Sequence, residues 1–331
     1  MICRTDRIGD VILTLPVADV LRETFPKAVI DMLVQSRVHG LIEDYHAIDN
    51  VIKIDEVTVS GISKLCREGN YDLAIAVYPE FSLALGLKLG GVKHRLGTGY
   101  RWYSFLFNLK HYQHRKEALK HESRYNLDLL EVLNIFYNKE LSPSIKVSDE
   151  HMLKAIEKIT KANPGKILNA SDTYIVIHIP TLGSAKAWRN ENFSFLINLL
   201  LQNNADYKII FTGTEEEIQQ IFQIIDNYKE NNRILTALNL NLKELAAILN
   251  RAKLFLGNST GPVHIAAAVG TFVVGLYSPV KVESPVRWGP LTENKKIFVP
   301  PKDDDSRDVM NDIKPEEVHN FIINYMESSI K

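Results

Sequence analysis

Short apolar segments rich in β-branched residues alternate with helical segments along almost the whole of this 331-residue chain. Most of the apolar segments are nearly continuous runs, which is typical of parallel strands that are covered on both faces. Strands and helices that alternate in this way predict a doubly wound α/β fold. The expected strands are residues 1–3, 28–34, 73–78, 174–179, 208–212, 254–257 and 271–277, and the expected helices include 17–24, 193–202, 215–229 and 242–250.

The length of the chain and one break in the pattern indicate two domains. A chain of 331 residues corresponds to two domains of about 150 residues each. Two long helical stretches, 122–137 and 150–161, interrupt the alternation, and residues 162–166 (ANPGK) then form a turn before the next strand. We therefore expect the domain boundary near residues 162–172.

Composition excludes several classes of protein. The chain has 39 Lys and Arg against 40 Asp and Glu, so it is a poor candidate for general binding to nucleic acid. Cys3 and Cys66 match no metal or redox spacing, which favours a reducing compartment. The longest apolar run, residues 266–277, is too short to span a bilayer, and no apolar signal region opens the chain. We expect a cytoplasmic protein.

Ligands of doubly wound sheets bind beyond the carboxyl ends of the strands, so the loops after the strands are the candidate sites. The first such loop, residues 4–16, has the sequence RTDRIGDVILTLP. Asp10 follows the flexible Gly9 at or near the start of a helix, where it is either an N-cap or an ionised general base. Pro16 lies inside the expected helix and should kink it.

The loop after residues 174–179 combines small residues, hydroxyls and a cation. Thr181, Ser184 and Lys186 resemble a phosphate site in composition, because hydroxyls donate hydrogen bonds and lysine supplies a point charge. The spacing of a Walker motif is absent. An ordinary surface loop remains the alternative.

The sharpest local signal is NSTGPVHIAAA at residues 258–268. Ser259 and Thr260 precede Gly261 and Pro262, which begin a helix of small residues. Such a strand, tight turn and bare helix N-terminus make an anion site from free amides and the helix dipole. A capped helix without a ligand is the alternative. His264, one turn into the helix, is either structural or catalytic.

Two further segments carry charge. Residues 215–217 are three glutamates that either complement a helix dipole or accept hydrogen bonds from a ribose diol. Residues 88–124 contain nine Lys and Arg, two Glu, four His and interleaved aromatic residues. This segment either contacts an anionic membrane surface or a phosphorylated acceptor, or forms a solvated face over core aromatics.

Taken together and in this order, the loops resemble glycosyltransferase family 9, the ADP-heptose:lipopolysaccharide heptosyltransferases. The resemblance covers nearly the whole chain, and eight motifs are in register. They are RxDRIGDVILTLP (4–16), YDLAI (71–75), RLGTGY (95–100), HESRYNLDLL (121–130), KAW (186–188), NSTGPVHIAAA (258–268), RWGP (287–290) and IKPEEV (313–318).

The resemblance implies a GT-B fold, in which two Rossmann-like domains face a central cleft. Residues 1–165 would form the acceptor domain, residues 166–312 the nucleotide-sugar domain, and residues 313–331 a final helix that packs back on the first domain. The resemblance also implies inversion at the anomeric carbon, no metal and no cofactor other than an ADP-sugar as donor.

The resemblance also assigns roles to single residues. Asp10 matches the catalytic base and Lys186 the lysine that holds the donor diphosphate. Glu217 matches the acid that binds ribose, with Glu216 as the alternative. The expected donor site comprises Thr181, Ser184, Glu217, Ser259, Thr260, Gly261, Pro262 and His264, and the expected acceptor site comprises Arg7, Arg101 and Arg124.

This sequence departs from the family at three places. Ser259 stands where the family usually has an aspartate that is expected to bind hydroxyls of the donor sugar. The family's KRWP is KAWR here, and the usual Cys-Met before the last helix is Val309-Met310.

We expect heptose transfer to a lipopolysaccharide-core or related glycolipid acceptor at the inner membrane surface, with peripheral contact to that membrane left open. The alternatives are another nucleotide sugar or a non-catalytic sugar-binding descendant. A nicotinamide-dependent oxidoreductase is disfavoured because no GxGxxG follows a strand.

Overall fold

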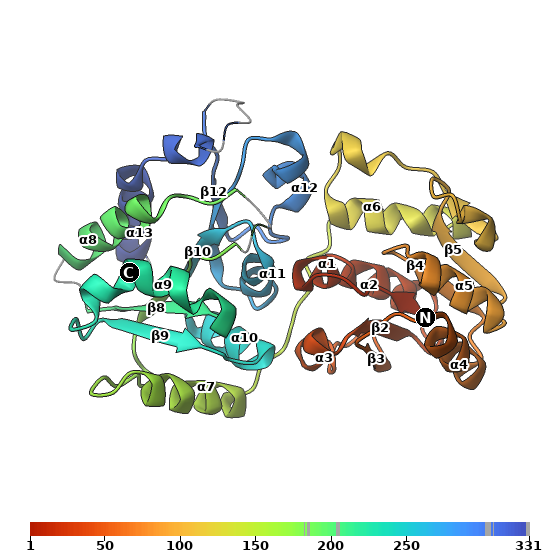
Figure 1. Cartoon of the computed structure of the whole chain (residues 1–331), viewed down its shortest axis with the longest axis horizontal. Helices are drawn as coiled ribbons and strands as arrows, with labels where there is room; N and C mark the ends of the chain where they lie inside the picture. Colours follow the sequence, from red (N-terminus) through yellow and green to blue (C-terminus); the bar gives the residue numbers. More distant parts are fainter. Residues whose placement is uncertain (182, 184–185, 203–205, 302–305, 307, 329–331) are drawn as a thin grey trace. The chain divides into compact units, whose positions relative to one another are not determined.

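The computed structural model describes residues 1–181, 183, 186–202, 206–301, 306 and 308–328. The chain divides into two compact units, Met1–Ile145 and Lys146–Lys331, and each unit is built on one six-stranded sheet whose paired strands run parallel (Figure 1). The predicted α/β architecture with two sheets is therefore confirmed.

The first unit has the strand order β3-β2-β1-β4-β5-β6. Strands β2 and β3 lie on one side of β1, and β4, β5 and β6 lie on the other side. Its strands are β1 (Ile2–Cys3), β2 (Asp31–Gln35), β3 (Asn50–Ile54), β4 (Leu73–Ala76), β5 (His94–Thr98) and β6 (Leu109–His111). Its α-helices are α1 (Ile8–Ile12), α2 (Leu15–Thr24), α3 (Ser36–Ile42), α4 (Val59–Gly69), α5 (Phe81–Leu89) and α6 (Glu122–Asp128).

The second unit has the order β12-β11-β10-β7-β8-β9, with β10 and β7 at its centre. Its strands are β7 (Tyr174–His178), β8 (Lys208–Gly213), β9 (Ile234–Leu238), β10 (Leu254–Asn258), β11 (Phe272–Leu276) and β12 (Lys295–Phe298). Its α-helices are α7 (Asp149–Ala162), α8 (Asn190–Gln202), α9 (Ile218–Ile225), α10 (Leu242–Arg251), α11 (Gly261–Ala268), α12 (Pro285–Trp288) and α13 (Pro315–Ser328).

Pro16 does not kink a helix, because one helix ends before it and a new helix begins at Leu15. Helix α1 ends at Ile12, Thr14 is the N-cap of α2, and Pro16 occupies the first turn of α2. A proline is tolerated there because the amide that it lacks has no partner within the helix. The two short helices therefore replace the single kinked helix that the sequence predicted.

The domain boundary lies earlier than predicted. Helix α7, which we expected to close the first domain, packs against α10 and β9 of the second unit. Its Lys158 pairs with the buried Glu244 at 2.6 Å, and Asn163 hydrogen-bonds the backbone of Thr236. The turn-forming sequence at residues 162–166 thus separates a helix from a strand within one unit. Turn-forming residues indicate only that the chain changes direction. The chain does so in any loop as well as at a domain boundary.

The last helix is part of the second unit. The buried face of α13, with Val318 and Ile322, belongs to the hydrophobic core of the second unit. Helix α13 packs against α8, and its Phe321 and Tyr325 contact Phe272 of β11. Residues 313–328 are therefore part of the second unit rather than a separate element.

Five strands were missed in the sequence, namely β3, β5, β6, β9 and β12. Strands β3, β6, β9 and β12 are the outer strands of their sheets, and β5 is next to an outer strand. In β3, β6 and β12 no residue is fully buried, so these strands lack the continuous apolar run by which the central strands are recognised. Strand β9 is mostly buried and is an exception to this explanation.

Candidate functional site

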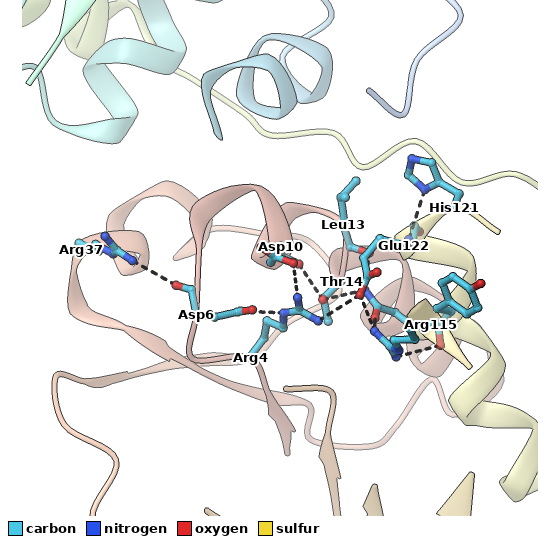
Figure 2. Close-up of polar contacts among 12 residues, drawn as sticks. Arg4, Asp6, Asp10, Leu13, Thr14, Arg37, Arg115, His121 and Glu122 are labelled. Atoms are coloured by element: carbon cyan, nitrogen blue, oxygen red, sulfur yellow. Dashed lines mark hydrogen bonds and ion pairs between the residues drawn. The ribbon is translucent and has the colours of Figure 1, made fainter. Parts of the chain in front are cut away.

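Arg4 is at the centre of a buried charge cluster in the first unit. It follows the short strand β1, its side chain is 4% exposed, and its three guanidinium nitrogens point at three different carboxylates (Figure 2). Nε donates to Asp6 at 2.7 Å, Nη2 donates to Asp10, and Nη1 lies 3.9 Å from Glu122. Buried charges are stable in a protein when they are paired and hydrogen-bonded, as they are here.

Asp10 is the third residue of α1 rather than its N-cap. The N-cap is Arg7, which makes no side-chain capping bond, and the carboxylate of Asp10 is used by Arg4 instead. Burial raises the pKa of Asp10 to about 6, against the opposing attraction of Arg4. The negative charges of Asp6 and Glu122 raise this pKa further, and Arg7 lowers it. At neutral pH the group is therefore mostly ionised and can accept a proton.

The cluster continues from Glu122 to helix α2. Glu122 is 2% exposed and also accepts a hydrogen bond from Arg115, which lies in the segment after β6. Arg115 donates to the buried Asn126 at 2.9 Å, and Asn126 in turn donates to Leu13 and Thr14. The hydroxyl of Thr14 donates to the carbonyl of Asp10 at 2.8 Å. Both the backbone and the carboxylate of Asp10 are thus held by one connected set of polar contacts.

The predicted acceptor-binding arginines differ in their surroundings. Arg7 and Arg101 are exposed. Arg124 is half-buried, pairs with Asp128 at 2.8 Å and donates to the carbonyl of Tyr137. The guanidinium of Arg124 is therefore used in contacts within its own unit, which gives it a structural role that the sequence did not indicate.

The second candidate region lies beyond the carboxyl ends of β7, β8 and β10. Strand β7 pairs with both β8 and β10, so the loops that follow these three strands lie at one edge of the sheet. Asn258, the last residue of β10, is completely buried. Its side chain donates to the carbonyl of Ile179 at 2.8 Å and accepts from the backbone amide of Trp188 at 3.1 Å. One amide side chain thus ties both ends of the 179–188 loop to β10.

Helix α11 begins as the sequence predicted. Thr260 is its N-cap and makes no side-chain capping bond, while Pro262 lies in the first turn. Ser259, Thr260, Gly261 and Pro262 are all half-buried, so the start of the helix is open to solvent. Such a helix N-terminus attracts anions through its free amides and its dipole.

Tyr277, which contacts Ser259, and His264 of α11 are both buried. Ser259 hydrogen-bonds the hydroxyl of Tyr277, which itself donates to the carbonyl of Trp288 at 2.9 Å. His264 is 5% exposed within α11. The hydroxyl of Ser259 therefore has a hydrogen-bond partner within the protein. The comparison of this position with the family motif did not predict that partner.

The segment before α13 supports the loop that carries Lys186. Trp188 is 1% exposed and donates from its indole nitrogen to the carbonyl of Ile313 at 3.0 Å. The ammonium of Lys186 donates to the carbonyl of Ser306 at 3.2 Å. Two contacts between side chains also join these segments: Arg189 donates to Asp308, and Asn192 donates to Asn311. Residues 186–192 thus lie beside Ser306 and residues 308–313.

The glutamates after β8 differ in their burial and in their hydrogen bonds. Glu217 is 7% exposed and its carboxylate accepts from the amide of Thr214 at 2.8 Å, in a capping box. Glu216 is exposed. The buried His178 contacts Thr212 through Nδ1 at 3.0 Å, and burial lowers its pKa despite the nearby charge of Glu217. His178 is therefore neutral at physiological pH.

In the second unit the structure joins part of the expected donor site, because Asn258 ties the loop of Thr181 and Lys186 to the strand before α11. Thr181 is buried in the loop that Asn258 holds, whereas Ser184 lies outside the described residues. Sequence reasoning missed Arg4, Glu122 and Asn258, although all three lie within quoted motifs. A charged or amide residue directly after an apolar strand, as at Arg4 and Asn258, was the available signal. Within the described part of the chain, no three His, Cys, Asp or Glu side chains are grouped so that they could hold a metal ion.

This chain is similar in sequence and in structure to proteins named as heptosyltransferases. Lipopolysaccharide heptosyltransferase 3 of Escherichia coli K12 is 26% identical over 300 residues, which are 86% of this chain and 83% of the relative. The structure of E. coli ADP-heptose LPS heptosyltransferase II superimposes with a TM-score of 0.83 at 17% identity, over 100% of this chain and 99% of the other. The structure of E. coli heptosyltransferase WaaC with ADP gives 0.71 at 21% identity, with 98% of each chain covered.

The likeness to these structures confirms the predicted GT-B fold class. The family described as glycosyltransferase family 9 (heptosyltransferase) matches residues 61–314, which is most of the 331-residue chain. The motifs and their arrangement at the strand ends agree with this match. The chain therefore belongs to glycosyltransferase family 9 and is a glycosyltransferase.

Proposed function

We propose that the protein transfers heptose from ADP-heptose to a hydroxyl of a lipopolysaccharide-core or related glycolipid acceptor, with inversion at the anomeric carbon. The observation that carries this proposal is the carboxylate of Asp10, held by the buried Arg4 with its pKa raised to about 6. Membership of the family supports glycosyl transfer, and the relatives named as lipopolysaccharide heptosyltransferases support the donor and acceptor.

In the proposed reaction Asp10 accepts the proton of the acceptor hydroxyl. The acceptor oxygen then forms a bond to the anomeric carbon while the bond from that carbon to the phosphate oxygen of the donor breaks. The departing ADP carries away the electron pair and the negative charge. Positioned proton transfer of this kind contributes a factor of about 10²–10⁴ in rate.

We place the donor diphosphate at the N-terminus of α11, with Lys186 from the neighbouring loop. Free amides at a helix start and an ammonium group are both suited to the charge that develops on ADP. Asn258 supports this placement because it ties the lysine-bearing loop to the strand that precedes α11. The family resemblance implies that turnover needs no metal, so we expect activity to persist in excess chelator.

The test is product formation followed by mass spectrometry, with ADP-heptose and a deacylated lipopolysaccharide-core acceptor. We expect a mass increase of one heptose, and Asp10→Asn should lower kcat by about 10²–10⁴-fold. Asp55→Asn, at an exposed position of the same unit, is the matched control and should leave kcat unchanged. Asp10→Asn with full activity would contradict the role of Asp10.

A different donor sugar is the second candidate, and Ser259 favours it. Its hydroxyl bonds Tyr277, so this position offers the sugar no charged partner where the family usually has an aspartate. We would screen a panel of nucleotide sugars against the wild type and Ser259→Asp. Preference of the wild type for a sugar other than heptose, and a shift toward heptose in Ser259→Asp, would support this candidate over the first.

We also propose a cytoplasmic location with peripheral contact to an anionic membrane through residues 100–120. Trp102, Phe105 and Tyr112 are 74%, 64% and 61% exposed. Exposed cations accompany them at Arg101, Lys110, Lys116 and Lys120. Exposed aromatic side chains with cations suit a headgroup layer. Among the described residues no helix is long and apolar enough to span a bilayer.

Co-sedimentation with vesicles tests this contact. The protein should bind vesicles that contain phosphatidylglycerol and should bind neutral phosphatidylcholine vesicles weakly. The double variant Trp102→Ser and Phe105→Ser should bind less, whereas the exposed control Phe136→Ser should not change binding. Equal binding of all three proteins would contradict this surface.

A further inference from the structure

The guanidinium of Arg4 organises three carboxylates around one rigid plane. Each of Nε, Nη1 and Nη2 is directed at a different acid, Asp6, Glu122 and Asp10 respectively (Figure 2). A guanidinium offers its donors in a fixed fork, whereas a lysine ammonium is a single point charge. The direction of the Asp10 carboxylate is therefore set by the orientation of the Arg4 side chain.

Glu122 in turn fixes that orientation from another part of the chain. It comes from α6, it is almost completely buried, and Arg115 holds its Oε1 atom. The same oxygen faces Nη1 of Arg4. Glu122 therefore lies between two cations and faces a different nitrogen of the Arg4 guanidinium from the one that donates to Asp10.

We propose that Arg4 and Glu122 are positioning residues that orient the Asp10 carboxylate toward the acceptor hydroxyl, with Arg115 as the anchor of Glu122. The inference rests on the proposed function of Asp10 as the base. Neither Arg4 nor Glu122 needs to touch the acceptor for this role, because both act through the contacts of the cluster.

The two residues have opposite electrostatic effects on Asp10. The cation of Arg4 lowers the pKa of Asp10, and the anion of Glu122 raises it. The other charges that face Asp10 are Asp6, which raises this pKa, and Arg7, which lowers it. Removal of each positioning residue should therefore move the titration of Asp10 in a different direction, which loss of packing alone would not do.

The experiment combines two measurements on the full chain. The carboxyl carbon of Asp10 is titrated by ¹³C NMR, with its signal assigned by its loss in Asp10→Asn, and the pH dependence of kcat is measured with ADP-heptose and the acceptor. In Arg4→Gln the pKa of Asp10 should rise above that of the wild type, and the acid limb of the kcat profile should follow. In Glu122→Gln both should move to lower pH.

Arg4→Gln and Glu122→Gln should also lower kcat at its optimum pH by about 10²-fold, because the Asp10 carboxylate is no longer held in the orientation that faces the acceptor hydroxyl. Arg4→Lys should keep the titration of Asp10 close to that of the wild type and still lose kcat, since it retains the charge but not the fork. The KM for the donor should not change in any of these variants. The control is Arg22→Gln, which breaks the Arg22–Asp49 pair elsewhere in this unit and should alter neither measurement.

If Arg4→Gln does not fold, the half-buried Arg115→Gln provides a second route. Loss of Arg115 leaves the charge of Glu122 less neutralised, so the pKa of Asp10 should rise while kcat falls. Equal or parallel shifts in Arg4→Gln and Glu122→Gln, or an unchanged titration in both, would overturn the positioning role. Opposite shifts without turnover in any preparation, the wild type included, would retain the electrostatic network and contradict the proposed function instead.

Discussion

The two units of this protein share a parallel six-stranded architecture but hold their candidate functional residues in different ways. In the first unit, buried charges around Arg4 orient Asp10. In the second unit, the neutral side chain of Asn258 and the backbone of Thr260 and Gly261 shape the candidate anion site. The same topology thus supports an ionisable site in one unit and a site of backbone amides in the other.

This difference separates what pH should affect from what it should not. Carboxylates that are buried and close together titrate in the weakly acidic range, whereas amides and helix dipoles carry no titrating proton there. We therefore expect the catalytic function of the first unit to depend on pH and the geometry of the second to be insensitive to it.

Within the second unit, the largest effect should come from Lys186. Lys186→Gln removes the ammonium group that we place beside the donor diphosphate, and kcat should fall by about 10²–10³-fold, comparable to loss of an oxyanion-hole donor. The acid limb of the kcat profile should stay where it is in the wild type, because Lys186 lies outside the Arg4 cluster. Steady-state kinetics from pH 5 to 9 measure both quantities.

The control for Lys186 is Arg189→Gln. Arg189 is an exposed cation of the same loop that pairs with Asp308, so its loss should change kcat little. A shift of the acid limb of the kcat profile in Lys186→Gln would show that the two units are not electrostatically independent. It would contradict the distinction between a pH-dependent first unit and a pH-insensitive second unit.

Asn258 should have the next largest effect, on stability. Asn258→Ala leaves the buried amide of Trp188 and the carbonyl of Ile179 without a partner, at a cost of about 1–3 kcal/mol for each group. Urea denaturation should show this loss equally at pH 5 and pH 8. Asn250→Ala, which removes one contact at an exposed position, is the control and should cost less than 1 kcal/mol, or about the net value of one hydrogen bond.

Asp10 should make the stability of the first unit depend on pH. Its pKa of about 6 in the folded chain exceeds the ordinary value of 3.8, so the folded state binds more protons than the unfolded state between these values. The free energy of unfolding should therefore fall as pH rises from 4 to 6, by on the order of 2–3 kcal/mol. Burial raises the pKa of Asp6 as well, which adds to the same trend.

Urea midpoints at pH 4.5, 5.5 and 7 measure this dependence. Asp10→Asn cannot titrate at this position, so its curve should be flatter than that of the wild type over the same range. Parallel curves for the two proteins would mean that Asp10 does not control the acid stability of the first unit.

The smallest effect should come from the glutamates after β8. Glu217→Gln keeps an oxygen that can accept from the amide of Thr214, so the free energy of unfolding should fall by less than about 1 kcal/mol. If Glu217 binds the ribose of the donor, the KM for the donor should rise in this variant and not in Glu216→Gln. The reverse result would assign the ribose to the exposed Glu216.

The sequence predicted the central strands and the loops after them, because those strands are continuous apolar runs and the loops contain Gly, Pro and hydroxyl residues. It did not predict the partners of Asp10. Arg4 and Glu122 are far apart in the chain, and only the folded structure brings α6 against the loop after β1. Capping chemistry next to Asp10 was visible in the sequence, but the buried arginine competes more strongly for the carboxylate than the helix start does.

The domain boundary and the last helix could not be predicted for a related reason. An amphipathic helix such as α7 or α13 shows in its sequence that one face is buried, but not which sheet it covers. The contacts of Lys158 with Glu244 and of Phe321 with Phe272 decide this question. The resemblance implied that α13 packs back on the first domain, and this stays a prediction; the described contacts place its buried face in the core of the second unit.

The contacts of residues 186–192 with Ser306 and residues 308–313 have a consequence for protein engineering. A chimera that exchanges one of these segments with a relative, and leaves the other, would mismatch the indole of Trp188 with its acceptor at Ile313. The two segments should be transplanted as a pair. For the same reason, a fusion partner or truncation near the C-terminal helix should be tested first for its effect on nucleotide affinity, because the lysine-bearing loop rests on the chain just before that helix.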